Sequence, residues 1–162
     1  MESSFTTRAA LPGEIDRLAE LWYESWQDAH AAILPEELRR DRTLESFRRR
    51  LEETLDLVRV VGESNDPMGF CIVKDDELYQ LYVARPARGS GVAATLVADA
   101  EERIKKSGGR VAWLACAIGN RRAARFYEKC GWRLIGKMVS QLETAKGIFP
   151  LEVWRYEKVL RP

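Results

Sequence analysis

Hydrophobic residues follow two different spacings along this chain, and the change between them marks its central unit. Leu78–Val83 is rich in aromatic and branched residues, which is typical of a strand. Charged residues then separate apolar ones that recur at helical spacing, namely Val92, Leu96, Val97, Ala100 and Ile104. The pattern predicts a strand, a turn and a helix over Leu78–Lys106.

Upstream of this unit the pattern predicts helices and strands in turn. Phe5–Ala10 has the composition of a strand, and an apolar stripe from Ile15 to Ala29 predicts a helix. Thr43–Leu55 predicts a second helix with Thr43 as its N-cap, and Ala31–Arg42 between the two is expected to be a loop. Leu57–Glu63 and Met68–Lys74 then predict an antiparallel pair of strands that leads into the Leu78 strand.

Downstream, Val111–Cys116 predicts a strand that a right-handed helical crossover places parallel to the Leu78 strand. A helix is predicted to begin after Asn120, which is a good N-cap by residue type. Trp132–Val139 and Leu151–Val159 predict the last strand pair, joined by a long loop at Ser140–Pro150. We therefore predict one domain over residues 1–162, an α/β fold with about seven mostly antiparallel strands and about four helices.

Composition narrows the classes of function. The 162 residues are 46% hydrophobic and 31% charged, as in soluble globular proteins. A net charge of +1 gives no electrostatic case for nucleic acid or a membrane as main partner. We find neither a signal-like N-terminus nor an 18-residue apolar run, so we expect a cytoplasmic protein.

A run of arginines between Arg39 and Arg50 resembles a nucleic-acid patch at first sight. Asp41 and Glu45 interrupt it, and Glu52 and Glu53 follow, so a solvated helix face is the better interpretation. Two alternatives stay open. The face could bind a protein partner, or a subset of its arginines could bind an acidic ligand or a phosphate group.

Cysteine and histidine chemistry is sparse. Cys71, Cys116 and Cys130 are widely spaced with no C-x-x-C pair, and His30 is the single histidine. A thiol nucleophile needs a partnered base, and metal sites need clustered ligands. The sequence therefore predicts reduced structural thiols and no metal.

The turn of the central unit, Arg88-Gly89-Ser90-Gly91-Val92-Ala93, predicts an anion site, because two glycines and a helix start expose backbone N–H groups. Gly89-x-Gly91-x-x-Ala94 also fits a dinucleotide fingerprint. That fold needs its first glycine directly after the strand and an acid about 20 residues on. Five residues intervene after Val83, and Arg110–Cys116 contains no acid, so phosphate of another ligand is favoured.

A second motif makes a family resemblance specific. Residues 88–93 fit R-x-x-G-x-A, and residues 120–132 fit N-x-x-A-x-x-F-Y-x-x-x-G-F except that Trp132 replaces the final Phe. In this order and spacing the two motifs resemble those of the GCN5-related N-acetyltransferases, the GNAT family. The resemblance covers about Leu57–Lys158 and implies a splayed pair of parallel central strands that holds the pantetheine arm of acetyl-CoA.

The resemblance also implies an activity, the direct transfer of acetyl from acetyl-CoA to a primary amine without an acyl-enzyme. A CoA-binding regulatory module with little turnover is the alternative. The family's cofactor contacts correspond here to Leu81, Tyr82, Val83, Arg88, Gly89, Ser90, Gly91, Val92, Ala93, Asn120, Ala123 and Tyr127.

The same resemblance suggests catalytic roles. Tyr127 matches the general acid that protonates the CoA sulfur, although a packing tyrosine is the alternative. Glu77 is the first candidate for a general base, with Asp76, His30 or ordered water as rivals. Trp26 and His30 either face the amine acceptor or belong to the core. The alternating Leu151–Tyr156 segment further suggests a homodimer through the last strands.

Overall fold

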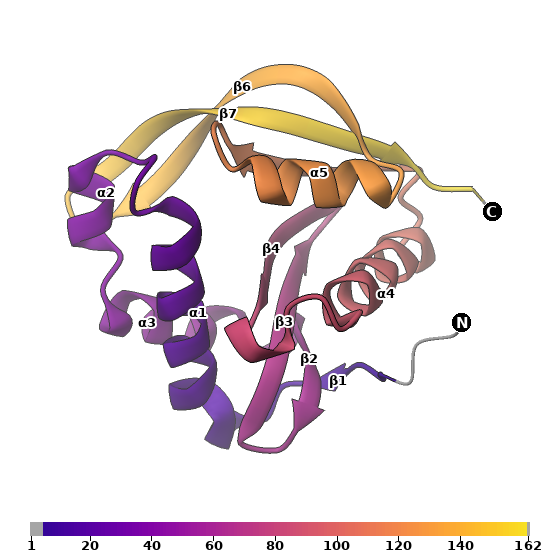
Figure 1. The fold of residues 1–162 in the computed structure, drawn as a ribbon, viewed down its shortest axis with the longest axis horizontal. Helices are drawn as coiled ribbons and strands as arrows, with labels where there is room; N and C mark the ends of the chain where they lie inside the picture. The colour runs from indigo at the N-terminus through magenta and orange to yellow at the C-terminus, as the bar shows by residue number, and fades with distance from the viewer. Residues whose placement is uncertain (1–4, 162) are drawn as a thin grey trace.

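The computed structural model describes residues 5–161, which fold around a seven-stranded sheet of order β1-β2-β3-β4-β5-β7-β6 (Figure 1). Every neighbouring pair is antiparallel except β4 and β5, which are parallel. The strands are β1 (Arg8–Ala9), β2 (Val58–Glu63), β3 (Asp66–Lys74), β4 (Glu77–Val83), β5 (Val111–Ala117), β6 (Arg133–Thr144) and β7 (Gly147–Val159).

Helices flank both faces of the sheet. Thr43 caps its helix by accepting a hydrogen bond from the Ser46 N–H at 3.1 Å, and Asn120 Oδ1 accepts one from the Ala123 N–H at 3.3 Å, so both predicted N-caps are confirmed. Within residues 5–161 no helix is long and apolar enough to cross a membrane. The helices are α1 (Ile15–His30), α2 (Glu36–Asp41), α3 (Leu44–Thr54), α4 (Val92–Lys106) and α5 (Arg121–Lys129), with short 3-10 turns at Pro12–Glu14, Leu55–Leu57 and Arg85–Ala87.

Two apolar cores lie on opposite faces of the sheet. On one face α1 and α3 bury an aromatic cluster in which Trp22, Phe47 and Phe70 have no exposed surface. On the other face α4 and α5 pack against β3, β4 and β5. All five apolar positions predicted for α4 are buried there, so its helical stripe is confirmed.

The parallel strands separate almost as soon as they meet. β4 and β5 share a single residue pair, Glu77 with Trp113, supported by a hydrogen bond from the Trp113 N–H to the Asp76 carbonyl at 3.0 Å. The β3–β4 register also shifts between Ile72 and Val73, which leaves Tyr79 as an extra residue in a bulge on β4. The predicted splayed pair is confirmed, and beyond Glu77 the edge of β4 that faces β5 is open.

The first linker prediction was wrong, because Ala31–Arg42 contains helix α2. Glu36 and Glu37 lie in its first turn and Arg39 and Arg40 in its last, an arrangement that the helix dipole favours. Its single buried apolar residue, Leu38, is too little for a periodic pattern. Residues 5–161 therefore contain five α-helices, where about four were predicted.

The second linker prediction was also wrong, because Ser140–Pro150 is mostly strand. β6 and β7 form one long hairpin that pairs up to Thr144 with Gly147. Pro150 is tolerated because β5 pairs with β7 only from Val153 onward, so the hairpin projects beyond its neighbour there. The first strand is in turn shorter than predicted, two residues instead of Phe5–Ala10.

Candidate functional site

A narrow cavity of about 80 Å³ occupies the space where β4 and β5 diverge, and we call it the slot. Chain segments from α1, β4, β5 and α5 line it, so it joins residues that are far apart in the sequence. Six of the predicted site residues lie in its wall, namely His30, Leu81, Tyr82, Asn120, Ala123 and Tyr127.

Tyr127 lies at the α5 side of the slot with 9% of its surface exposed. Burial raises the pKa of its phenol well above the usual range, so the group keeps its proton at neutral pH. Among residues 5–161 its hydroxyl has no hydrogen-bond partner. Tyr127 therefore has a protonated hydroxyl, without a hydrogen-bond partner in the described chain, on a side chain that lines the slot.

The α1 side of the slot is formed by His30, the last residue of that helix. Its ring centroid lies 5.2 Å from that of Trp26 and 6.4 Å from that of Tyr82. Desolvation lowers the pKa of His30 to about 4, so the imidazole is neutral at pH 7 and is a weak base. Trp26 itself is 6% exposed, packs on Phe47 and lines neither of the cavities described here, so its place is the core.

The predicted anion loop has the required backbone geometry. Gly89 and Gly91 adopt φ angles of 78° and 99°, a region in which side chains are strained. Gly91 is the N-cap of α4 and supplies no side-chain acceptor, so the N–H groups of the first turn remain available. The loop and the helix end therefore have the backbone geometry that binding of phosphate oxygens requires.

Arg88 of this loop is held by α1. Its Nη2 lies 3.3 Å from Asp28 Oδ2, and Arg85 Nη2 donates to Asp28 Oδ1 at 2.6 Å. The two guanidinium groups hold the pKa of the Asp28 carboxyl below its usual range. Arg88 thus points toward a protein carboxylate, which an anionic ligand would have to replace.

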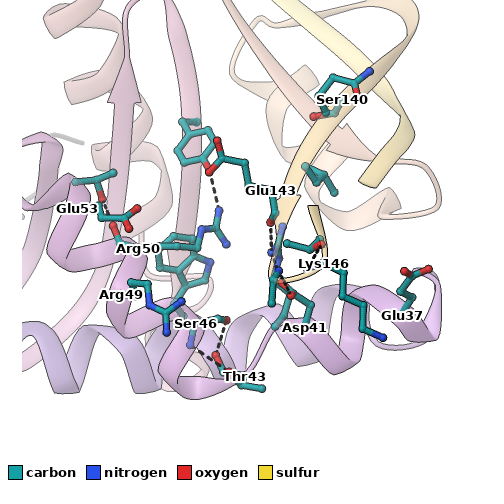
Figure 2. A pocket seen from close by; sticks show the side chains of 18 of the residues that line it. Glu37, Asp41, Thr43, Ser46, Arg49, Arg50, Glu53, Ser140, Glu143 and Lys146 are labelled. Carbon is teal, nitrogen blue, oxygen red and sulfur yellow. Dashed lines mark hydrogen bonds and ion pairs between the residues drawn. The ribbon is translucent and has the colours of Figure 1, made fainter. Parts of the chain in front are cut away.

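A much larger cavity of about 1210 Å³ lies on the sheet face that carries α1 and α3, and we call it the cleft (Figure 2). Its floor includes Glu77, Tyr79 and Trp113, and its walls come from α2, α3 and the β6–β7 hairpin. Tyr79, the bulged residue of β4, lines both the slot and the cleft. The two cavities therefore adjoin at the point where the parallel strands separate.

Glu77 stands at this junction. Burial raises the pKa of its carboxyl to about 7, against the opposing influence of Lys74 and Arg155. A carboxyl with this pKa is partly ionised at neutral pH and can both accept and release a proton. The predicted base is thus half-buried in the cleft rather than exposed at a turn.

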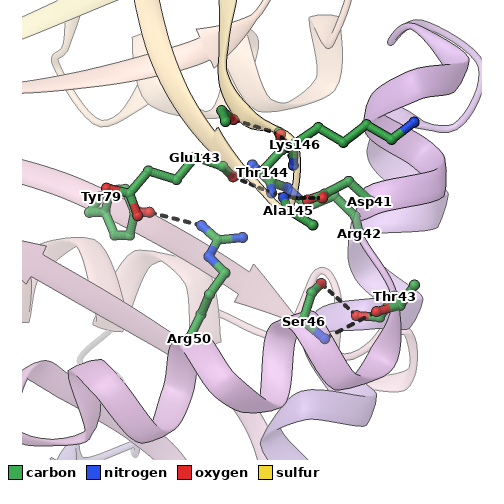
Figure 3. A network of polar contacts seen from close by, with 11 residues as sticks. Asp41, Arg42, Thr43, Ser46, Arg50, Tyr79, Glu143, Thr144, Ala145 and Lys146 are labelled. Atoms are coloured by element: carbon green, nitrogen blue, oxygen red, sulfur yellow. Dashed lines mark hydrogen bonds and ion pairs between the residues drawn. The ribbon is translucent and has the colours of Figure 1, made fainter.

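One wall of the cleft is fastened by a polar clamp, shown in Figure 3, that sequence reasoning missed. Arg42 is 6% exposed and donates to Asp41 Oδ2 at 2.8 Å and to the Glu143 carbonyl at 2.9 Å. Asp41 Oδ1 in turn accepts from the Ala145 N–H at 2.8 Å. No local signal marks this clamp, because its partners are about a hundred residues apart in the sequence.

A family model described as "Acetyltransferase (GNAT) family" matches residues 15–132, which span both motifs, the slot and most of the cleft. The chain belongs to the GNAT family.

Solved structures share the GNAT fold along nearly the whole chain. A GCN5-related N-acetyltransferase from Rhodopseudomonas palustris is 20% identical, with a TM-score of 0.76, 99% of this chain covered and 98% of that one. PaiA N-acetyltransferase from Thermoplasma acidophilum, solved in complex with coenzyme A, is 23% identical with a TM-score of 0.66, and the match covers 96% of this chain and 99% of that one. YncA from Salmonella typhimurium, solved with acetyl-CoA, is 16% identical with a TM-score of 0.65, and the match covers 99% of this chain and 96% of that one. No curated protein matches the chain.

Within this GNAT protein, sequence reasoning located the slot better than the cleft. Asn120, Ala123 and Tyr127 of the slot belong to the second motif of the family, whereas the cleft combines α2, α3 and the hairpin, which carry neither motif. Lys74 and Tyr79 of the cleft were therefore not predicted as site residues, and Arg50 was covered only by the open alternative that arginines of the Arg39–Arg50 run bind an acidic ligand.

Proposed function

We propose that this GNAT protein transfers the acetyl group of acetyl-CoA to a primary amine by direct attack in a ternary complex. The observation that carries the proposal is the slot between β4 and β5, which has a protonated tyrosine in its wall and adjoins a large cleft at Tyr79. A donor that enters from the slot and an acceptor that enters from the cleft would meet there.

The slot and the glycine loop suit different parts of acetyl-CoA. The N–H groups of Arg88 and Ser90 are bonded within the preceding turn, so the backbone N–H groups of Gly89, Gly91, Val92 and Ala93 and the positive end of α4 are the ones that suit the pyrophosphate. The open edge of β4 at Leu81, Tyr82 and Val83 suits the amide groups of the pantetheine arm, since β5 does not pair with it there. Asn120 and Ala123 line the slot from α5, near Tyr127.

The chemistry needs three proton and charge events. The amine must lose a proton before it forms its bond to the acetyl carbon, and Glu77 is positioned to accept that proton. An N–H of β4 stabilises negative charge on the thioester oxygen. Tyr127 donates its proton to the sulfur as the carbon–sulfur bond breaks. The proton that the nitrogen still carries after attack passes to the Tyr127 phenolate, and the proton held by Glu77 passes to solvent, so an amide and the CoA thiol are released and no acyl-enzyme forms.

Calorimetric titration with acetyl-CoA, followed by release of free CoA thiol in the presence of an amine panel, tests this function. Saturable binding with amine-dependent thiol release supports the transfer reaction. Binding without turnover of any amine would instead support the CoA-binding regulatory module. Absence of acetyl-CoA binding would contradict both.

Glu77 leads to a pH prediction. Because its carboxyl must be ionised to accept a proton, kcat/KM for the amine should rise with pH through an apparent pKa near 7. In Glu77→Gln this ascending limb should disappear and the rate near pH 8 should fall about 100-fold. Asp76→Asn is the matched control, since that neighbouring carboxylate is exposed and only its backbone carbonyl is bonded. A limb that survives in Glu77→Gln would assign the base elsewhere.

Asp28 leads to a prediction about affinity. In Asp28→Ala, Arg88 no longer has to leave a carboxylate to meet a phosphate, so acetyl-CoA should bind up to about fivefold more tightly. The control is Asp16→Ala, which removes a comparable exposed carboxylate of α1 that pairs with Arg48. Calorimetry in low and high salt measures the effect. Equal acetyl-CoA affinities of Asp28→Ala and wild type would indicate that Arg88 does not bind a phosphate of acetyl-CoA.

A further inference from the structure

Two cations on the inner wall of the cleft form no ion pair in the described part of the chain, although Lys74 lies opposite Glu77 and favours the ionised form of that carboxyl. Arg50 on α3 and Lys74 at the end of β3 are both half-buried and both line the cleft. Neither forms an ion pair with any residue in the described range 5–161. A partly buried charge without a counter-ion is costly, so this pair calls for an explanation.

The contacts of Arg50 hold its guanidinium in place without using most of its donors. The group stacks 4.4 Å from the Trp22 ring centroid, and its Nη2 donates to the Tyr79 hydroxyl at 2.8 Å. Figure 3 shows it directed from α3 toward Tyr79. A guanidinium has five N–H donors. Within residues 5–161 the Tyr79 hydroxyl is the one acceptor of the Arg50 guanidinium, so its other N–H donors remain available to a ligand.

Lys74 reaches the same aromatic ring from the sheet. Its Nζ lies 3.8 Å from the Tyr79 ring centroid, and the Arg50 guanidinium carbon lies 5.8 Å from it. Tyr79 also borders the slot, so this pair of cations lies beside the junction where acetyl transfer would occur. The positive charge is therefore close to the reaction site and not at the outer rim.

Acidic residues of the cleft are distributed differently. Glu36, Glu37, Glu45 and Glu53 are exposed on α2 and α3 at its rim. Deeper in, Asp41 is neutralised by Arg42. Glu143 of the hairpin extends toward Arg50 in Figures 2 and 3, but it is exposed and forms no ion pair within the described range.

Glu77 is the remaining inner carboxyl of the cleft, and its burial keeps it partly protonated near neutral pH. The inner cleft thus offers an excess of positive charge from Arg50 and Lys74, next to one titratable acid. Such a pairing suits a ligand that carries an amine and an acid group together.

We propose that the acceptor is a small primary amine that also carries a carboxylate, as amino acids do. Arg50 and Lys74 bind the carboxylate while the amine faces Glu77 and the slot. This inference rests on the proposed acetyl transfer, whose acceptor it specifies. Arginine's planar fork matches the two carboxylate oxygens, and Lys74 adds a further donor.

The test compares amines that differ only in the acid group. Common α-amino acids, β-alanine and 4-aminobutyrate are assayed beside their carboxamides, and aminoalkyl phosphates form a separate arm, with thiol release as readout. Calorimetric binding of the same compounds to the CoA-loaded protein provides a measurement independent of turnover. The variants are Arg50→Gln and Lys74→Gln, with Arg49→Gln as control, since Arg49 is exposed on the same cleft and makes no ion pair in the described chain.

We expect kcat/KM for the best carboxylate-bearing amine to exceed that of its carboxamide by about 10- to 100-fold. Arg50→Gln and Lys74→Gln should erase this preference mainly by raising KM and should leave the acetyl-CoA affinity unchanged. Arg49→Gln should keep the preference for the carboxylate-bearing amine. Because Arg50 packs on Trp22, Lys74→Gln keeps the test decisive if Arg50→Gln is unstable. A preference for phosphates over carboxylates would overturn the choice of acid group.

Other outcomes separate this inference from the proposed function. Turnover of amines and carboxamides at equal rates would overturn the inference and leave acetyl transfer intact. Carboxylate binding that depends on Arg50 and Lys74, without turnover, would overturn acetyl transfer and support the anion site. Absence of both binding and turnover would overturn both.

Discussion

Replacement of Gly91 by glutamate should weaken acetyl-CoA binding by at least about 100-fold while the protein stays folded. Gly91 caps α4 at a φ of 99° and exposes the N–H groups that are proposed to hold the pyrophosphate. A glutamate would place its own carboxylate at the positive end of the helix and repel the phosphates. Its Cβ meets only Phe5 Cε2, at 3.9 Å, so steric clash is not the cause.

Gly108→Glu is the matched control for Gly91→Glu. Gly108 lies just past the other end of α4 with a φ of 93° and open space around its Cβ position. Both variants therefore carry a similar backbone strain of about 1 to 2 kcal/mol, but only Gly91→Glu alters the anion loop. Calorimetry should find wild-type affinity in Gly108→Glu, and equal losses in both variants would indicate that strain, not the phosphate site, governs binding.

Tyr127→Phe should reduce kcat about 100-fold with little change in acetyl-CoA affinity. The change removes only the hydroxyl, which has no partner in the described chain and whose pKa is raised by burial. Without the donor, the thiolate leaves unprotonated and the carbon–sulfur bond breaks more slowly. Single-turnover rates, together with calorimetry, separate this loss from a loss of binding.

Tyr156→Phe is the comparison for Tyr127→Phe. Tyr156 is 2% exposed, its ring centroid lies 6.4 Å from that of Tyr127, and its hydroxyl donates to Glu128 Oε2 at 2.9 Å. Losing that bond should cost about 1 kcal/mol of unfolding free energy and leave kcat unchanged. A wild-type kcat in Tyr127→Phe would indicate that Tyr127 is a packing residue and not the general acid.

The elements that the sequence predicted well are those with local signals. The helix after Gly91 carries an uninterrupted apolar stripe, and the caps Thr43 and Asn120 act on residues three positions away. The slot could be anticipated because the residue pattern predicts the β4 strand and the second motif of the family places Tyr127 on α5. Local chemistry was sufficient for these parts.

The cleft could not be predicted in the same way. Its wall depends on α2, which has one buried apolar residue, and on hairpin residues that alternate weakly and include Pro150. Neither the stacking of Arg50 on Trp22 nor its bond to Tyr79 has a short-range signature, since Tyr79 is 29 residues away. These contacts form only when the whole fold assembles.

The α1 stripe shows a further limit. Trp26 and His30 are four residues apart on one side of the helix, so helical periodicity predicted the same environment for both side chains. In the structure one lies in the aromatic core and the other at the slot, because the helix ends at His30 beside the diverging strands. Periodicity assigns a face of a helix but not the position along it where a core gives way to a cavity.

The clamp between Asp41, Arg42 and the hairpin has a consequence for chimeric proteins. A hairpin transplanted alone from a relative would keep the Arg42 and Asp41 bonds only if its backbone followed the same path, because the hairpin partners are the carbonyl of residue 143 and the N–H of residue 145; a different path would leave the buried guanidinium without that acceptor. Grafting residues 35–43 together with residues 138–150 would keep these contacts within one graft. The α2 side and the hairpin side of the cleft wall are thus exchangeable as a pair of segments and not as either segment alone.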